Sequence, residues 1–307
     1  MTRRLRIACV QLEPVFKDPA ASMRRADELL VSVAPSTLDL LVLPEMAFTG
    51  YYFQSREDVD PFAEDATSGP TFQWAAQTAR RLSCYVVVGL PTSSAADGSQ
   101  LSSKEFYNSL LIVSPSGLLT HVYHKHHLFG GPPPERAVDY LWATAGAGFT
   151  ALDLPFPSSS PHAQGGATFR LVPGICMDLN ERDFAPTDEY ALASFAAEQD
   201  ADVLLVAMSW LDSAAEEGLR EARDPEGTDG EDEWRDVLTY WVVRSMPLLG
   251  SGAALVCANR VGREGDTVFT GLSCALELKS RPQVVKYASK RRAEIVHAVV
   301  ELPTRDD

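Results

Sequence analysis

Residues 171–180 of the chain read LVPGICMDLN. A strand-like run at residues 169–172 leads into Gly174 and Cys176, and polar residues follow at once. This pattern is typical of a buried strand that ends at a sharp turn, where a thiol can meet a substrate. Because a cysteine in an apolar run is often an inert core residue, the rest of the chain has to distinguish the two interpretations.

Strand-like apolar runs and helix-like periodic segments alternate on both sides of this stretch. Before it we expect strands at 5–11, 38–44 and 84–90, helices at 20–33 and after residue 70, and a hairpin at 107–114 and 118–123. From it onward we expect strands at 169–176, 203–210, 253–258, 267–278 and 294–302, and helices at 189–197 and 234–249.

The order β-α-β-α-β-β-β therefore occurs twice. Helices between buried strands favour parallel pairing, whereas hairpins favour antiparallel edges. Two such halves stacked sheet to sheet predict an α/β fold, a four-layer α-β-β-α sandwich. No long linker separates the halves, so we expect a single domain over residues 1–307.

Composition narrows the class of protein further. The net charge of −15 disfavours nucleic acid as a partner, because phosphate backbones repel an acidic chain. No apolar run is long enough to span a bilayer, and the first residues lack the cleavage site of a signal peptide. The five cysteines are widely spaced without a C-x-x-C pair, which is typical of free thiols in a reducing compartment. We expect a cytoplasmic protein, or one shared with the nucleus, that makes no contact with membranes.

Two more reactive residues follow expected strands: Glu45 follows residues 38–44, and Lys125 follows residues 118–123. Ligands gather at the carboxyl ends of strands in open α/β sheets, so these residues and Cys176 form a candidate set of base, cation and nucleophile. A neutral thiol needs a base, and Glu45 can take its proton and later give it to departing ammonia. Lys125 can stabilise the oxyanion, with the Met177 backbone N–H as a second donor.

The segments that carry these residues resemble a known family. Residues 43–51 (LPEMAFTGY), 124–129 (HKHHLF) and 174–178 (GICMD) are similar to the Glu–Lys–Cys signature of the nitrilase superfamily of carbon–nitrogen hydrolases. Other stretches resemble its protein N-terminal amidase branch, which deamidates N-terminal Asn and Gln of proteins. These are residues 107–110 (YNSL), 208–211 (MSWL), 240–248 (YWVVRSMPL) and 258–262 (ANRVG).

The resemblance implies the same four-layer sandwich and an amidohydrolase that does not cleave peptide bonds. It implies hydrolysis of a side-chain amide to Asp or Glu through a cysteine thioester, with release of ammonia and without a cofactor. It also implies that protein or peptide N-termini are the substrate, upstream of degradation that depends on the N-terminal residue.

One part of the family pattern is altered. Members of the superfamily usually carry a second glutamate soon after the lysine, which helps to position the substrate and the lysine. Here residues 130–142 read GGPPPERAVDYLW. Alignment on Trp142 favours Asp139 as the second acid, whereas residue type favours Glu135, and the sequence leaves both open.

Several nearby residues have a structural and a functional interpretation. Asp178 either caps the turn after the cysteine or orients it, and it joins Glu135 and Asp139 as a candidate for binding the substrate α-ammonium. Ser209 and Trp210 end an expected strand beside Cys176, and Trp210 is either core or a wall of the pocket. Asn108 opens a hairpin strand, and we predict a turn role for it.

Three functions compete at this point. The first is deamidation of N-terminal Asn or Gln. The second is a small-molecule ω-amidase or carbamoyl-amide hydrolase with the same chemistry, and the third is a non-catalytic protein that binds N-termini. The intact Glu–Lys–Cys set argues against the third. The four histidines around Lys125 lack an acid or cysteine at zinc spacing, so we expect no metal. Monomer and homodimer remain equally open.

Overall fold

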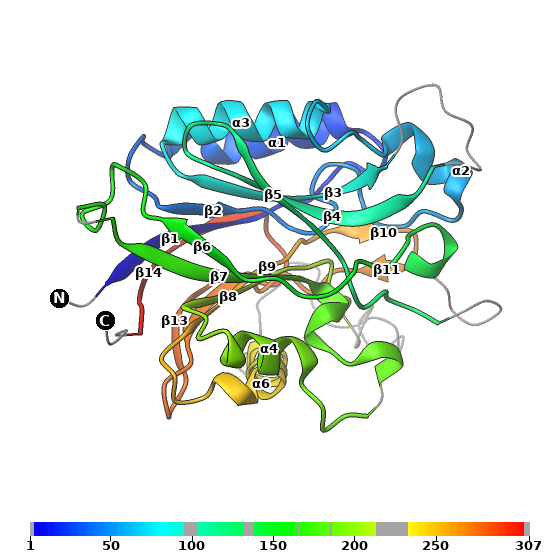
Figure 1. Cartoon of the computed structure of the whole chain (residues 1–307). Helices are drawn as coiled ribbons and strands as arrows, with labels where there is room; N and C mark the ends of the chain where they lie inside the picture. The colour runs from blue at the N-terminus through cyan, green and yellow to red at the C-terminus, as the bar shows by residue number, and fades with distance from the viewer. Residues whose placement is uncertain are drawn as a thin grey trace.

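Two six-stranded sheets pack face to face and carry helices on their outer faces (Figure 1). The computed structural model describes residues 3–94, 104–131, 138–164, 166–184, 186–212 and 233–303. Helices α1 (Pro19–Leu29) and α3 (Pro70–Leu82) cover one outer face, and α4 (Ala191–Glu198) and α6 (Glu233–Arg244) cover the other (Figure 1). The predicted four-layer α-β-β-α sandwich is confirmed.

The first sheet has the strand order β14-β1-β2-β3-β4-β5. Strands β1, β2 and β3 pair in parallel, and β4 and β5 continue the sheet antiparallel. The elements of this half are β1 (Arg4–Gln11), α1 (Pro19–Leu29), η1 (Leu30–Ser32), β2 (Leu40–Val42), α2 (Arg56–Val59), η2 (Asp60–Phe62), α3 (Pro70–Leu82), β3 (Tyr85–Ser93), β4 (Phe106–Val113), β5 (Leu119–His124) and, from the end of the chain, β14 (Glu294–Glu301).

The second sheet repeats this plan in the order β13-β12-β9-β8-β7-β6. Strands β7, β8 and β9 are parallel, and β12 and β13 are antiparallel. The elements of this half of the chain are η4 (Asp139–Leu141), β6 (Leu152–Pro155), β7 (Thr168–Ile175), η5 (Cys176–Leu179), η6 (Arg182–Phe184), α4 (Ala191–Glu198), β8 (Val203–Ala207), α6 (Glu233–Arg244), η7 (Met246–Leu248), β9 (Ala254–Ala258), the separate small hairpin β10 (Arg263–Glu264) and β11 (Thr267–Val268), β12 (Cys274–Glu277) and β13 (Gln283–Tyr287).

The duplicated order holds with one exchange of strands. The segment at 294–302, expected to end the second sheet, forms β14 and pairs with β1 in the first sheet. Strand β13 takes its place in the second sheet, and β6 adds a strand beside β7. Neither was predicted, because all five residues of β13 are exposed and β6 has only four residues, so no apolar pattern marks them.

Successive side chains of β1 point to opposite faces of the first sheet, and this explains how the layers form. Leu5, Ile7 and Cys9 join the cluster between the two sheets, whereas Ala8 and Val10 pack toward α1 and α3. Each fully buried aliphatic side chain of this kind stabilises the fold by about 1.5–3 kcal/mol. The sheets are thereby fixed against each other, and so are the ends of their strands.

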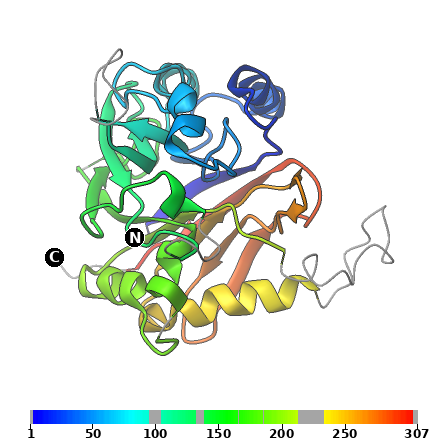
Figure 2. The same ribbon diagram turned by 90° about the vertical axis from the view of Figure 1, so that its right-hand side faces the viewer.

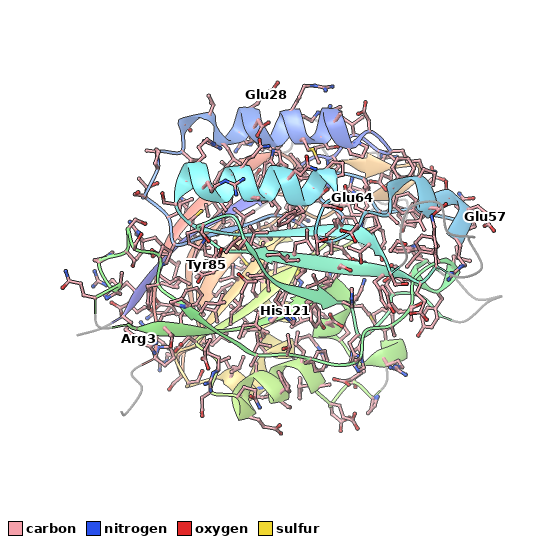
Figure 3. The ribbon with its side chains drawn as sticks, turned by 45° about the horizontal axis from the view of Figure 1, so that its top comes forward. Arg3, Glu28, Glu57, Glu64, Tyr85 and His121 are labelled. Atoms are coloured by element: carbon pink, nitrogen blue, oxygen red, sulfur yellow. The ribbon has the colours of Figure 1, made fainter. Side chains whose placement is uncertain are left out.

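The outer helices lie differently on the two faces. Helix α6 runs across the direction of α1 and α3, which are seen end-on when α6 is seen lengthwise (Figure 2). Glu28 projects from α1 into solvent, and Arg3 and Glu57 lie at opposite ends of the molecule (Figure 3). Among the helices within the described ranges, none combines the length and apolar character needed to cross a bilayer.

Candidate active site

Four strand ends from both sheets converge on one buried place. Glu45 follows β2 and Lys125 follows β5 in the first sheet, whereas Cys176 follows β7 and Ser209 lies just beyond β8 in the second. The side chains of Glu45 and Lys125 are fully buried, and Cys176 is 7% exposed. The structure thus places these predicted site residues together.

The thiol sits on a strained turn. Cys176 has a φ of 43°, a left-handed conformation that is uncommon for residues other than glycine. It directly follows the last residue of β7 and begins η5. Gly174 permits close packing just before it, since a Cβ there would lie 2.6 Å from Leu192 Cδ2. The turn leaves the thiol close enough to Glu45 and Lys125 of the first sheet for their charges to shift its pKa.

Glu45 is held by three hydrogen bonds to its carboxylate. Oε1 accepts from Asn108 Nδ2 at 2.7 Å and from Lys125 Nζ at 2.8 Å, and Oε2 accepts from the Ser209 amide at 2.8 Å. Burial raises the pKa of Glu45, which the Lys125 charge opposes and the Asp139 charge reinforces. The result is a carboxylate of fixed orientation that is more basic than an exposed one.

Lys125 lies between two carboxylates. Its Nζ is 2.7 Å from Asp139 Oδ2 as well as 2.8 Å from Glu45 Oε1, and all three side chains are fully buried. Burial opposes the charge on Lys125, but Asp139 and Glu45 outweigh it and raise the pKa of the lysine. The lysine is therefore a fixed cation. Tyr51 Oη at 3.1 Å and the Phe129 amide at 2.9 Å donate to Asp139 and hold it in place.

The geometry bears on the choice between the two candidate acids. Asp139 contacts the lysine directly, in the position expected of a second acid. Glu135 lies outside the residues that the structure describes.

The electrostatics around Cys176 favour a neutral resting thiol. Burial raises its pKa well above the ordinary value and the Glu45 charge raises it further, whereas Lys125 and the Ser209 amide lower it. A thiol of this kind needs a base during attack, and Glu45 is placed to be that base. The arrangement can thus run nucleophilic acyl transfer with a carboxylate base and a lysine cation.

Asp178 ties the two catalytic segments together. Its Oδ1 accepts from the His126 and His127 amides at 3.0 and 2.7 Å, and its Oδ2 accepts from Tyr123 Oη and the Ile175 amide, both at 2.8 Å. These donors flank Lys125 on the first sheet and Cys176 on the second. With four donors around a fully buried carboxylate, the geometry supports a turn-orienting role and is less suited to binding an α-ammonium.

We predict that Asp178→Asn lowers kcat/KM about tenfold or more and the free energy of unfolding by about 1–3 kcal/mol, because an amide nitrogen would face buried N–H donors. Steady-state kinetics and chemical denaturation measure the two effects. Asp39→Asn is the matched control, since Asp39 is equally buried, accepts from Arg6, and lies at the opposite end of β2. It should lose stability without loss of kcat/KM. Unchanged kinetics in Asp178→Asn would refute the orienting role.

The remaining predicted site residues lie close to the cysteine. Met177 is buried within η5. Ser209 also donates from Oγ to the Glu45 backbone oxygen at 3.2 Å. Trp210 is partly buried, and its ring packs on Tyr240 and Trp241 at centroid distances of 5.7 and 5.9 Å. Both interpretations of Trp210, core residue and pocket wall, are compatible with this position.

Asn108 differs from its prediction. It lies within β4, is fully buried and donates to Glu45, whereas we expected a turn residue at a strand edge. The sequence did contain a signal for this role, because Asn108 lies inside the largely apolar run 106–113. A side-chain amide that is buried in a strand requires a hydrogen-bond partner.

Tyr51, which holds Asp139, was also missed. Its amide is fixed by Glu264 at 3.0 Å, and Gly50 leaves room for that carboxylate, since a Cβ there would lie 2.6 Å from Glu264 Oε1.

The histidines around Lys125 organise its loop. His124 Nδ1 is 2.7 Å from Ser109 Oγ, His126 Nδ1 is 2.7 Å from the Gly146 oxygen, and His127 Nδ1 is 2.7 Å from the Asn180 oxygen. Within the part of the chain that the structure describes, no group of three or more His, Cys, Asp or Glu side chains is arranged to hold a metal ion.

Two stacked sheets with a glutamate, a lysine and a cysteine at converging strand ends define a class of amide-cleaving enzymes. A model of the carbon–nitrogen hydrolase family matches residues 6–212, and the chain belongs to this family.

Within the family, the chain is 31% identical to the protein N-terminal amidase of Schizosaccharomyces pombe, over 97% of this chain and 99% of that protein. It is 26% identical to the protein N-terminal amidase of Saccharomyces cerevisiae, over 69% of this chain and 46% of that protein.

Solved structures show the same fold. A crystal structure of an N-terminal amidase with a Gln-Val peptide superposes with a TM-score of 0.81 at 18% identity, covering 99% of each chain. The nitrilase-superfamily member Nit3 of Saccharomyces cerevisiae gives a TM-score of 0.66 at 16% identity, covering 97% of this chain and 90% of that one.

Proposed function

We propose that this protein hydrolyses the side-chain amide of N-terminal Asn or Gln in proteins and peptides, giving Asp or Glu and ammonia. The observation that carries the proposal is the buried Glu45–Lys125–Asp139 set around a strained Cys176. Near full-length similarity to a protein N-terminal amidase supports the choice of substrate. So do the Gln-Val and Asn-Glu peptides bound by N-terminal amidases of the same fold.

The first half-reaction forms a thioester. Cys176 Sγ attacks the amide carbon while Glu45 takes the thiol proton, and Lys125 Nζ and the Met177 backbone N–H stabilise the oxyanion. The carbon–nitrogen bond then breaks, and the nitrogen takes the proton from Glu45 and leaves as ammonia. Asp139 keeps the lysine in place during this step, as the second acid.

The second half-reaction regenerates the enzyme. Glu45 takes a proton from water, the hydroxide oxygen attacks the thioester carbon, and the carbon–sulfur bond breaks. Cys176 recovers its proton, and the peptide leaves with an N-terminal Asp or Glu. Because Glu45 must be ionised in both halves, we expect kcat/KM to fall as the pH drops through its raised pKa.

A catalytic unit that extends over residues 1–307 is consistent with β14, near the end of the chain, pairing along all of β1. The buried free cysteines suit a reducing compartment, so we place the reaction in the cytoplasm, with the nucleus as a further location. Trp210 beside Ser209 is suited to be an aromatic wall for the first residues of the peptide.

Short peptides with N-terminal Asn or Gln test the proposal. We expect one ammonia per peptide, and a fall in kcat/KM of about 30-fold or more after Nα-acetylation, since loss of one partner of a buried charge pair costs about 2–5 kcal/mol. Free ω-amides and carbamoyl compounds are the comparison substrates. If these are turned over and the free-N-terminal peptides are not, the enzyme is a small-molecule amidase and the proposal fails.

A further inference from the structure

Asn108 is hydrogen-bonded at only one end of its side-chain amide. Nδ2 donates to Glu45 Oε1 at 2.7 Å. Oδ1 is buried and accepts no hydrogen bond from any of the described residues. A buried amide oxygen without a hydrogen-bond donor destabilises the folded protein, so an unpaired oxygen beside the catalytic base points to a partner that comes with the substrate.

The chemistry of Glu45 fixes which end of the amide faces it. A carboxylate only accepts hydrogen bonds, so the NH₂ group must point to Oε1 and the oxygen must point elsewhere. The dimensions of an amide then place Oδ1 within about 5 Å of Glu45 Oε1. The backbone around it is fixed, because the Asn108 backbone oxygen accepts from the Lys125 backbone amide at 2.8 Å, directly beyond the last pair of the β4–β5 ladder.

This region is the one that the departing nitrogen must enter. In the proposed reaction, that nitrogen receives its proton from Glu45 and therefore comes within hydrogen-bond distance of the carboxylate. Lys125 is a donor and suits the carbonyl oxygen, whereas the N–H groups of an amide need an acceptor. Asn108 Oδ1 is a buried neutral acceptor with no other use among the described residues.

We propose that Asn108 Oδ1 accepts a hydrogen bond from the substrate amide nitrogen as it leaves, so that Asn108 selects primary amides over esters of the same acid. The inference rests on the proposed function and deepens it. With an amide, the carbon–nitrogen bond breaks, the nitrogen takes the proton from Glu45 and ammonia leaves. With a methyl ester, the carbon–oxygen bond breaks, the oxygen takes the same proton and methanol leaves.

The two substrates differ only in the step that Asn108 affects. Both give the same thioester on Cys176, so deacylation is shared, and the ratio of their kcat/KM values reports acylation alone. The ester oxygen has no N–H, so it gains nothing from Oδ1. The nitrogen gains positive character as it is protonated, and a hydrogen bond to a charged group contributes about 1.5–3 kcal/mol, which corresponds to about 10–150-fold in rate.

The experiment compares a peptide with N-terminal Gln and the same peptide with N-terminal glutamate γ-methyl ester. Asn108→Ala and Asn108→Leu both remove the acceptor oxygen. The second variant keeps the test usable if the first does not fold. Each also removes a donor to Glu45, which lowers both activities. We expect kcat/KM for the amide to fall about 10–100-fold further than for the ester. Ser209→Ala, which removes the 3.2 Å bond to the Glu45 backbone, should lower both equally.

Equal losses for amide and ester in the folded Asn108 variants would overturn the inference and leave the proposed function standing. If the wild-type enzyme releases no ammonia from the Gln peptide, the proposed function fails instead.

Discussion

Replacing Cys176 with alanine is expected to lower kcat for ammonia release by about five to six orders of magnitude, as happens when the nucleophile of a catalytic set is removed. No other thiol can replace it, because Cys176 is the one cysteine of the five that follows the carboxyl end of a strand, whereas Cys9, Cys257 and Cys274 lie within β1, β9 and β12 and Cys84 precedes β3. Glu45, Lys125 and Asp139 remain in place but have no nucleophile to act on. Ammonia release from Asn and Gln peptides measures the loss.

The fold should survive this change. Alanine retains the backbone of the turn, and Cys176 contributes little buried apolar volume, so the thermal midpoint should stay close to that of the wild type. Cys257→Ala serves as the control, because it removes a core thiol of β9 and should retain activity. Persistent ammonia release from purified Cys176→Ala would show that the nucleophile lies elsewhere.

Replacing Lys125 with methionine is expected to be the second most damaging change. Loss of one oxyanion donor alone costs about 10²–10³-fold in kcat. It also leaves two buried carboxylates facing each other without their shared cation, and breaking such an arrangement costs about 3–5 kcal/mol of folding stability. We expect both effects, measured by kinetics and by denaturant unfolding.

A double variant separates the two effects. Lys125→Met combined with Asp139→Leu removes one of the uncompensated charges, so much of the lost stability should return while activity stays low. If activity returned together with stability, Lys125 would have only a structural role. Unchanged kcat in the single variant would contradict its role as oxyanion donor.

The strand ends were the part of the site that the sequence could reveal. Apolar runs before Glu45, Lys125 and Cys176 each end at a reactive residue, and the carboxyl ends of parallel strands meet at one edge of a sheet. That rule applies within each sheet, and the face-to-face packing of the two sheets then brings Cys176 of the second sheet to Glu45 and Lys125 of the first. The sequence also predicted the four layers, since helices between buried strands must cover their outer faces.

Other features depend on contacts between residues far apart in the chain. Strand β14 belongs to the first sheet because it pairs with β1, and no local sequence pattern predicts this pairing. The sequence left Asp139 and Glu135 both open as the second acid, and the contact of Asp139 with Lys125 becomes visible only in the folded chain. We predicted a turn role for Asn108 because a single polar residue near the end of an apolar run is typical of the residue at which a strand ends.

In the proposed reaction, Cys176 forms a thioester with the side chain of an N-terminal Asn or Gln. Rapid acid quenching during turnover of a Gln peptide, followed by peptide mapping with mass spectrometry, tests it most directly. We predict an adduct with the mass of the peptide less ammonia on the fragment that carries Cys176, and much less of it with the Nα-acetylated peptide. An adduct on another cysteine, or turnover without any adduct on Cys176 under conditions where acylation outpaces hydrolysis, would contradict the claim.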